Sequence, residues 1–382
     1  MNFSFSDQQE MTARDCRQFA EKIIASQVKN FEDDLNLRLD LFKMMALEGF
    51  FSLSLANKDG KRDTVRYLLG LKAVAKIDAG IAVTMAVTNM VAEAIERFGN
   101  EGQKDDYLPK IAKGTCVPLS FAMTEKQAGS DVKAIQTSFV IDPQDPGVIV
   151  LNGTKQFITN GDIAGAMIVM AKGKWAEKER ISAFVVDRGV KGLNIVKKEN
   201  KLGLLTANLV SLEFKNCRLS KIFLLGNPGE GLKIALSTLD SGRLGIAAQS
   251  WGIAEAAFEA ALIFSRERKQ FGHAIGENQA IAFKLADMRV KLDAAKWLIL
   301  HAAWLKDSSL PFSMEAAEAK LYASEVCNEI VTEALQIHGG YGYIKDYPLE
   351  KYFRDARATT IYEGTSEMQR IVISRNLSWK RE

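Results

Sequence analysis

The sequence predicts a multidomain α+β protein in the order helices, β-structure, helices. Its 382 residues are too many for one small core, so two or three domains are expected. Apolar residues recur at helical spacing up to about residue 114, at strand-like spacing from about 117 to 225, and at helical spacing again from residue 231. We expect an N-terminal α-helical domain over residues 1–115, a middle antiparallel β-domain over 116–226 and a C-terminal four-helix bundle over 227–382.

Composition excludes several classes of function. The net charge of +3 comes from 50 basic and 47 acidic residues, and no basic stripe suggests nucleic acid as a partner. The four cysteines are far apart and only three histidines are present, which argues against a metal site. Scattered free cysteines fit a reducing compartment. Because no targeting segment and no membrane span is evident, we expect a cytoplasmic protein.

The sequence predicts helices in the N-terminal region. Ser6 and Gln9 form a capping-box pattern that opens the first helix. The segment 77–95 is almost wholly apolar or small and predicts a helix buried on most sides. Too many polar residues interrupt it for a membrane span, namely Asp78, Thr84, Thr88, Asn89 and Glu93.

The middle region alternates β-rich runs with turn residues. The dipeptides Asn152-Gly153 and Asn160-Gly161 are turn signals between these runs. This spacing predicts a small antiparallel sheet or barrel. The predicted strands include the runs 148–151, 167–170, 182–186 and 209–214.

Long helices are predicted again in the C-terminal region, over residues 245–268, 287–306 and 313–339. The first of them is rich in alanine. Because helices lined by small residues can approach closely, this composition indicates a bundle.

A single carboxylate near the C-terminus is a candidate catalytic base. Glu363 lies between Tyr362 and Gly364, just before a helix that Thr365 or Ser366 could cap. A carboxylate in such a turn can be held rigidly with only its tip free, as removal of a carbon-bound proton requires. The alternative is a solvated loop acid beside an ordinary helix cap.

Four further clusters are candidates for binding an extended polar ligand. Each also has a plain structural explanation: a loop, a core aromatic, a helix end and a helix C-cap. The sequence holds neither a strand–GxGxxG–helix unit nor a GxxxxGK[ST] run, so Rossmann and P-loop sites are excluded. The clusters are Phe121–Asp131, Phe157–Asn160, Arg266–Gly272 and Gln336–Tyr343.

On these motifs the chain resembles the acyl-CoA dehydrogenase family, the FAD enzymes of the first β-oxidation step. Ala122–Ala134 matches one family motif and Gln336–Asp355 matches the other. The resemblance covers essentially all 382 residues. It implies that FAD lies between the β-domain and the bundle, with Phe121, Met123, Thr124, Ser130, Phe157 and Thr159 around the flavin ring.

The resemblance also implies a cofactor shared between subunits. In the family, a neighbouring subunit contributes Gln336 and Gly340 to the same FAD, so a homotetramer built as a dimer of dimers is expected. The remaining cofactor contacts would come from Arg268, Phe271 and Gln279 at the pyrophosphate and adenosine, and from Thr365 and Glu367.

Glu363 matches the family's catalytic base. The implied reaction converts an acyl-CoA to the trans-2-enoyl-CoA, with the β-hydride going to flavin N5 and electrons passing to electron-transfer flavoprotein. One branch of the family carries its base at the position of Gly242, and glycine here favours the short-chain, butyryl-type members. The residues that match CoA-ester contacts are Ser130, Asp240, Arg243, Gly364 and Arg375.

Two departures from the family leave the acyl group open. Lys126 replaces a usual proline, and residues 55–60 replace a longer Gly-Gly segment that shapes the acyl pocket in relatives. Alternatives are an enoyl-CoA reductase, or a glutaryl-, branched- or cyclic-acyl-CoA dehydrogenase. A desulfinase is disfavoured because Glu363 is intact. A non-catalytic acyl-CoA-binding protein would not need Glu363, Thr159 and Arg268 together.

Overall fold

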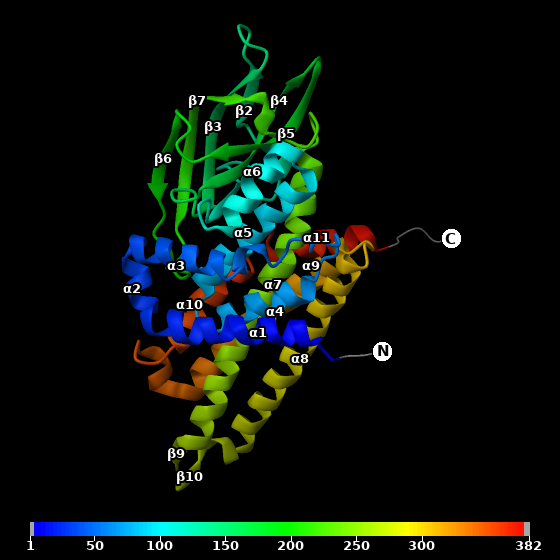
Figure 1. The fold of residues 1–382 in the computed structure, drawn as a ribbon. Coiled ribbons are helices and arrows are strands. Elements are labelled where there is room, and N and C mark those ends of the chain that lie inside the picture. Colours follow the sequence, from blue (N-terminus) through cyan, green and yellow to red (C-terminus); the bar gives the residue numbers. More distant parts are fainter. Residues whose placement is uncertain (1–3, 378–382) are drawn as a thin grey trace, which may run out of the picture.

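The computed structural model describes residues 4–377 and shows a sheet at one end of the molecule and two helical regions that pack against each other (Figure 1). The outer ends of the first and third expected domains, residues 1–3 and 378–382, lie outside the described part. The N-terminal helices are α1 (Asp7–Phe19), α2 (Val28–Asp33), α3 (Leu35–Leu47), α4 (Thr64–Ala75), α5 (Ala79–Phe98) and α6 (Glu101–Ala112).

The local predictions for this region are confirmed. The Ser6 hydroxyl accepts from the Gln9 N–H at 3.3 Å, and the Gln9 side chain accepts from the Ser6 N–H at 3.0 Å, so the capping box is formed. By length and composition α5 could cross a membrane, but 94% of its apolar window is buried inside the protein. It is the central helix of this region, with Asp78 as its N-cap.

The middle region is a mixed sheet rather than the antiparallel one predicted. Its strand order is β6-β7-β3-β2-β4-β5-β8, and β1 pairs with β4 in parallel. The connection from β1 to β4 contains β2 and β3 and is long enough for a parallel crossover. The strands are β1 (Leu119–Ala122), β2 (Ser138–Ile141), β3 (Val148–Thr159), β4 (Ala166–Trp175), β5 (Lys178–Asp187), β6 (Leu193–Lys198), β7 (Leu209–Ser220) and β8 (Leu224–Leu225).

One of the two predicted turns is wrong. Asn160-Gly161 is a turn after β3, but Asn152-Gly153 lies inside β3 at an irregularity of its pairing with β7. A Cβ at Gly153 would be 2.5 Å from the Thr137 Cα, and its φ is +144°. The glycine therefore permits a close passage of two backbones rather than a reversal of the chain.

The C-terminal helices confirm the three long segments, although two of them begin earlier than predicted. Between residue 231 and the end of the described part at residue 377 lie three long helices and two shorter ones. They are α7 (Gly231–Glu267), α8 (Gln279–Asp307), α9 (Ser313–His338), α10 (Leu349–Thr359) and α11 (Ser366–Asn376).

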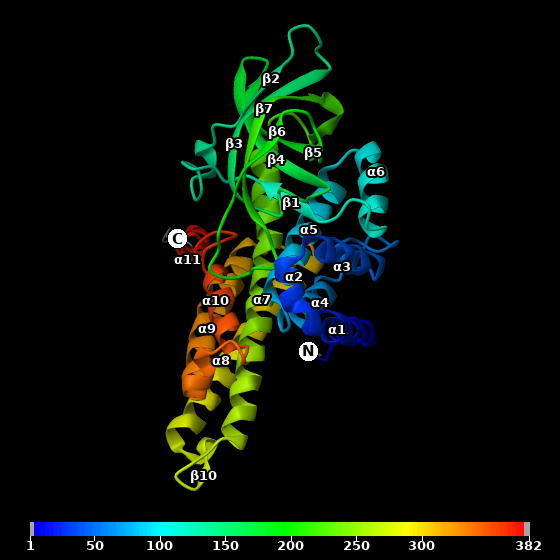
Figure 2. The ribbon, with the colours of Figure 1, turned by 90° about the vertical axis from the view of Figure 1, so that its left-hand side faces the viewer.

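Helix α7 is long and runs from beside the sheet through the helical part of the molecule (Figure 2). Its first residue, Gly231, packs on the backbone of Ser182 in β5. Further along, a Cβ at Gly252 would be 2.5 Å from the Lys72 carbonyl oxygen of α4. The far end leads into a small hairpin, β9 (Lys269–Gln270) and β10 (His273–Ala274), which lies opposite the sheet (Figure 1). Small residues thus allow one helix to contact all three regions.

Candidate active site

The turn between α10 and α11 holds Glu363 in an unusual backbone conformation. Glu363 has a φ of +53°, and Gly364 follows with a φ of +88°. A left-handed conformation is unfavourable for a residue with a side chain and is typical of functional sites, where the surroundings enforce it. Thr365 caps α11 by accepting from the Met368 N–H at 3.3 Å, so the predicted helix cap is confirmed.

The Glu363 carboxylate points into the protein. The residue as a whole is partly buried, but its Oε2 atom is enclosed and accepts no hydrogen bond within residues 4–377. Opposite lies Gly242 of α7, where a Cβ would be 2.5 Å from that Oε2 and 2.7 Å from the Met90 sulfur. The two positions that the sequence resemblance offers for a base therefore face the same space, and the Glu363 side chain occupies it.

Burial changes the proton affinity of this carboxyl group. It raises the pKa of Glu363 to about 7, against the opposing effect of the cations Arg243 and Lys320. A group with a pKa near neutrality can accept a proton and release it again at the same pH, as a general base must. The solvated loop acid considered from the sequence does not fit these surroundings.

The walls around the carboxylate come from three helices. A Cβ at Gly245 of α7 would be 3.1 Å from the Tyr67 hydroxyl of α4 and 3.5 Å from the Ala86 Cβ of α5. Tyr67 and Met90 are buried. The part of these walls formed by Met90 and Ala86 is apolar, as suits the hydrocarbon part of an acyl chain.

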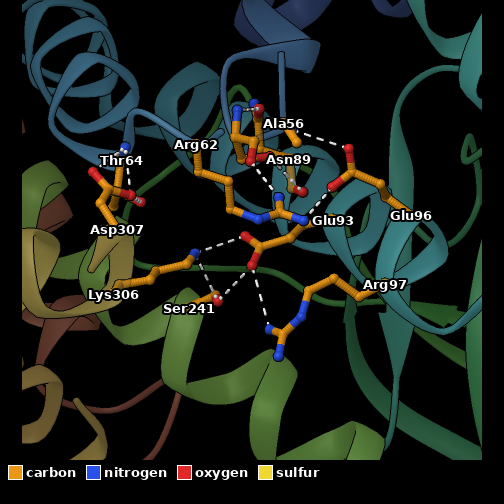
Figure 3. Close-up of polar contacts among 11 residues, drawn as sticks. Ala56, Arg62, Thr64, Asn89, Glu93, Glu96, Arg97, Ser241, Lys306 and Asp307 are labelled. Carbon is orange, nitrogen blue, oxygen red and sulfur yellow. Dashed lines mark hydrogen bonds and ion pairs between the residues drawn. The ribbon is translucent and has the colours of Figure 1, made fainter. Parts of the chain in front are cut away.

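A buried ion network fixes α7 beside the base (Figure 3). Lys306 of α8 donates to Glu93 of α5 at 2.8 Å and to the Ser241 hydroxyl at 2.9 Å. Ser241 in turn donates to Glu93 at 3.2 Å. Because Ser241 precedes Gly242, this network holds the segment of α7 next to the base against α5 and α8.

The segment 55–60, expected to shape the acyl pocket, is anchored next to this network. The Ala56 N–H donates to Glu96 of α5 at 3.0 Å, and Glu96 also pairs with Arg62 (Figure 3). Its effect on the acyl chain stays a prediction.

A second candidate surface forms where β1 and β3 end. The Gln156 N–H donates to the Thr124 carbonyl at 2.8 Å, and the Ser120 hydroxyl donates to the Thr159 carbonyl at 2.6 Å. Phe157 occupies an irregularity of the β3–β7 pairing with a φ of +58°, and it is 54% exposed. An aromatic ring presented to solvent by strained backbone indicates a surface for a planar ligand.

A buried ion pair supports the loop that follows β1. Lys155 of β3 donates to Glu125 at 2.7 Å and to the Met123 carbonyl at 3.0 Å, and both charged side chains are buried. Glu125 also accepts from the Thr137 N–H at 3.0 Å. The pair therefore joins β3 to both ends of the loop that carries Thr124 and Ser130.

The remaining cofactor candidates lie at the other end of α7. Arg268 and Gly340 line one cavity of about 410 Å³ with His338 and Tyr341, and the Arg268 guanidinium lies 5.5 Å from the centre of the Tyr341 ring. Phe271, in the adjacent hairpin, is 94% exposed. Two more candidates stand on neighbouring helix ends, Gln279 at the start of α8 and Gln336 in the last turn of α9.

Three family models match the chain, all described as acyl-CoA dehydrogenase. They are the N-terminal domain over residues 6–115, the middle domain over 120–217 and the C-terminal domain over 229–378. The chain belongs to the acyl-CoA dehydrogenase family.

Known relatives cover nearly the whole of this acyl-CoA dehydrogenase. Butyryl-CoA dehydrogenase from Megasphaera elsdenii is 38% identical, with a TM-score of 0.91 over 98% of this chain and 99% of that one. Subunit CarC of the caffeyl-CoA reductase–Etf complex from Acetobacterium woodii is 39% identical over 97% of this chain and 98% of its own length. An acyl-CoA dehydrogenase from Bacillus anthracis, complexed with FAD, is 29% identical, with a TM-score of 0.91 over 97% and 66% of the two chains.

The acyl-CoA dehydrogenase is a flavin-dependent oxidoreductase, and its residues fit FAD in two places. The exposed ring of Phe157 offers a face for the planar flavin. Arg268, above the Tyr341 ring, offers a guanidinium to a phosphate and lines a cavity beside Gly340.

Within one chain, Arg268 lies far from the base. Gly242, beside the base, and Arg268 are 26 residues apart along α7 and its end (268 − 242). At 1.5 Å per residue this separation is about 39 Å, and Figure 1 shows the sheet and the β9–β10 hairpin at opposite ends. Arg268 shares a cavity with Gly340, and the roles of both residues toward FAD stay predictions.

The structure does not gather every predicted substrate contact. Arg243 pairs with Asp240, which also accepts from the Ser313 hydroxyl at 3.0 Å, and both lie close to the base on α7. Within residues 4–377, no hydrogen bond or ion pair links Ser130 or Arg375 to Glu363, and both are exposed. Glu367 is exposed in the first turn of α11. The roles of Ser130, Arg375 and Glu367 stay predictions.

The sequence did not reveal the residues that hold the backbone of the turn around Glu363. Lys320 of α9 donates to the Gly364 carbonyl at 2.7 Å, and Gln369 of α11 donates to the same oxygen at 2.7 Å. The Tyr362 hydroxyl donates to Gln249 of α7. One signal was available, because Lys320 is a lone lysine among alanines on a helix face that is otherwise buried.

Proposed function

We propose that the protein oxidises a short-chain acyl-CoA to the trans-2-enoyl-CoA, with Glu363 as the base that removes the α-proton. The observation that carries this proposal is the enclosed Oε2 atom of Glu363, which has no hydrogen-bond partner within the described residues and faces Gly242. Desolvation gives this carboxylate the proton affinity that a weakly acidic carbon-bound proton demands. The similarity to butyryl-CoA dehydrogenase supports a short acyl group.

Each residue near the base has a defined task in this reaction. Met90, Ala86 and the Tyr67 ring exclude water from the α-carbon, which keeps the Glu363 carboxylate unsolvated until it takes the proton. The Glu363 N–H makes no hydrogen bond within residues 4–377 and is free to donate to the thioester carbonyl as enolate charge develops. FAD, when bound, supplies the acceptor for the β-hydride.

The test is anaerobic bleaching of the FAD-loaded protein by butyryl-CoA. Glu363→Gln should retain FAD and CoA-ester binding but lose bleaching by at least about a thousandfold, because an amide cannot accept the proton. Glu259→Gln, on an exposed part of α7, is the control and should bleach normally. Normal bleaching by Glu363→Gln would show that the base lies elsewhere.

A second candidate is the reverse reaction, reduction of an enoyl-CoA. The caffeyl-CoA reductase subunit is as similar to this chain as the butyryl-CoA dehydrogenase is. The same base would then return the proton to the α-carbon. Comparing turnover of butyryl-CoA with that of crotonyl-CoA, each with the electron carrier in the matching redox state, separates the two directions.

The similarity to known relatives also suggests a protein partner for the reaction. An electron-transfer flavoprotein is the proposed electron carrier, because the caffeyl-CoA reductase relative works in a complex named for Etf.

We assign the protein to the cytoplasm, since its four cysteines are all free and buried thiols.

The separated halves of the FAD site support a homotetramer. Helix α8 also carries large apolar residues at every seventh position, all of them exposed in the single chain. A stripe with this spacing suits contact with another helix. The residues are Phe283, Val290, Trp297 and Trp304, which are 60%, 68%, 42% and 56% exposed.

A further inference from the structure

The peptide unit after the base is clamped from two sides. The Gly364 carbonyl accepts from Lys320 of α9 and from Gln369 of α11, each at 2.7 Å. Gln369 donates in addition to the Glu363 carbonyl at 3.1 Å. Lys320 and Gln369 are both 0% exposed. Since Glu363 has a φ of +53°, which is unfavourable for a residue with a side chain, these bonds help to hold the turn in its strained form.

A lysine is an unusual choice for this clamp. A neutral side chain could hold one carbonyl oxygen without carrying a charge into the protein interior. Lys320 is buried among Ala316, Ala319 and Ala323, and burial lowers its pKa to about 8. The group that compensates its charge most strongly is Glu363 itself, ahead of Glu367 and Glu325.

Several charged or titratable groups face the base. Arg243 approaches from α7 and Lys320 from α9, and both favour the ionised carboxylate. Tyr67 faces it from α4, and Tyr362 stands beside it on the same turn. From α5 the uncharged Met90 faces the same space, with its sulfur 2.7 Å from where a Cβ at Gly242 would lie. Arg243 is already paired with Asp240, whereas Lys320 makes no ion pair within residues 4–377. Arg243 has the larger effect on the carboxyl group but shares its charge with Asp240, whereas Lys320 brings its charge to the turn that carries the base.

We propose that Lys320 is a positioning residue for catalysis, which holds the strained Glu363–Gly364 turn and keeps the base ionised. This inference rests on the proposed role of Glu363. Gln369 shares the first task, because it bonds the same carbonyl, but it carries no charge and cannot share the second. The two residues can therefore be separated by experiment.

The experiment measures the pH dependence of flavin reduction by butyryl-CoA in FAD-loaded variants. Lys320→Gln keeps a donor and loses the charge. Its acid limb should move to higher pH by about one unit, because an opposite charge no longer favours the carboxylate. Lys320→Met should show the same shift together with a lower rate at all pH values. Lys320→Arg should leave the limb near its original pH.

Gln369→Leu is the matched control for geometry. It should slow reduction about tenfold or more at every pH and leave the acid limb in place. The inference is wrong if Lys320→Gln and Lys320→Met keep the acid limb of the unmodified enzyme, however slow they are. If either variant fails to fold with FAD, the other and Lys320→Arg still report the position of the limb.

Parallel measurements on Glu363→Gln distinguish the proposed role of Glu363 from the proposed role of Lys320. If that variant still reduces its flavin, the proposed base is wrong, and any shift in the Lys320 variants has another origin. If Glu363→Gln is inactive while the acid limb of Lys320→Gln stays in place, Glu363 remains the base and only the role of Lys320 is refuted.

Discussion

Gly242 faces the base so closely that one added methyl group should disable it. A Cβ at this position would be 2.5 Å from the Glu363 Oε2 and 3.0 Å from its Cδ. Ordinary van der Waals contact begins at about 3.4 Å, so Gly242→Ala must displace the carboxylate by about 0.9 Å. The Met90 sulfur, 2.7 Å from the same Cβ, blocks the space on the other side.

The size of the effect follows from that displacement. A misplacement of about 1 Å at a reacting group costs on the order of a hundredfold in rate, or about 2.7 kcal/mol in the barrier. Stability works in the opposite direction, because alanine is favoured over glycine inside a helix by about 1 kcal/mol. Gly242→Ala should therefore fold and bind FAD, yet reduce its flavin about a hundred times more slowly.

Single-turnover flavin bleaching by butyryl-CoA measures this rate directly. The control is Gly245→Ala, about one turn further along α7, whose Cβ would meet the Tyr67 hydroxyl at 3.1 Å and not the carboxylate. That variant should change the preferred acyl length more than the rate of proton removal. Equal losses in the two variants, or an unimpaired Gly242→Ala, would refute the proposed geometry of the base.

Two further outcomes are expected. Because burial raises the pKa of Glu363 from 4.5 to about 7, folding favours its protonated form, and the resulting stability is lost as pH rises from 4.5 through 7. The free energy of unfolding of Glu363→Gln should then exceed that of the unmodified protein by about 3 kcal/mol at pH 8 and equal it near pH 4.5. Denaturation at both pH values measures this difference. Equal denaturation midpoints at pH 8 would contradict the prediction. Replacing Trp297 and Trp304 by glutamate should dissociate the oligomer and release FAD together, as sedimentation and flavin fluorescence would show. A monomer that keeps its FAD would disprove the shared site.

The regular part of the fold could be predicted because its signals are local. The segment 77–95 carries an uninterrupted apolar pattern and forms α5, and Ser6 opens α1 through contacts three residues away. Helix α7, in contrast, begins at residue 231 rather than 245. Its first turns mix polar and apolar residues, and they are helical because they pack against the sheet and α5. That tertiary contact outweighs the local pattern.

Long-range contacts also explain what was missed in the sheet and the site. The parallel partner of β1 is β4, which no local alternation of residues could reveal. The glycines of the C-terminal motif were predicted to let the backbone approach a ligand; Gly340 lines a cavity, and its contact with a ligand stays a prediction. The cations Lys155 and Lys320 contact segments thirty or more residues away, so their sequence neighbours carried no sign of their partners.

The surroundings of Glu363 balance two opposed requirements of a general base. Stronger desolvation by Met90 and the packed face of Gly242 would raise its proton affinity but leave less of it ionised at neutral pH. Stronger pairing with Arg243 or Lys320 would ionise it fully and weaken it as a base. A pKa of about 7 lies where the ionised fraction and the proton affinity are both substantial. Both cations act on the carboxylate without a hydrogen bond to its Oε2, so their charge tempers the effect of burial while that oxygen stays free for the substrate proton.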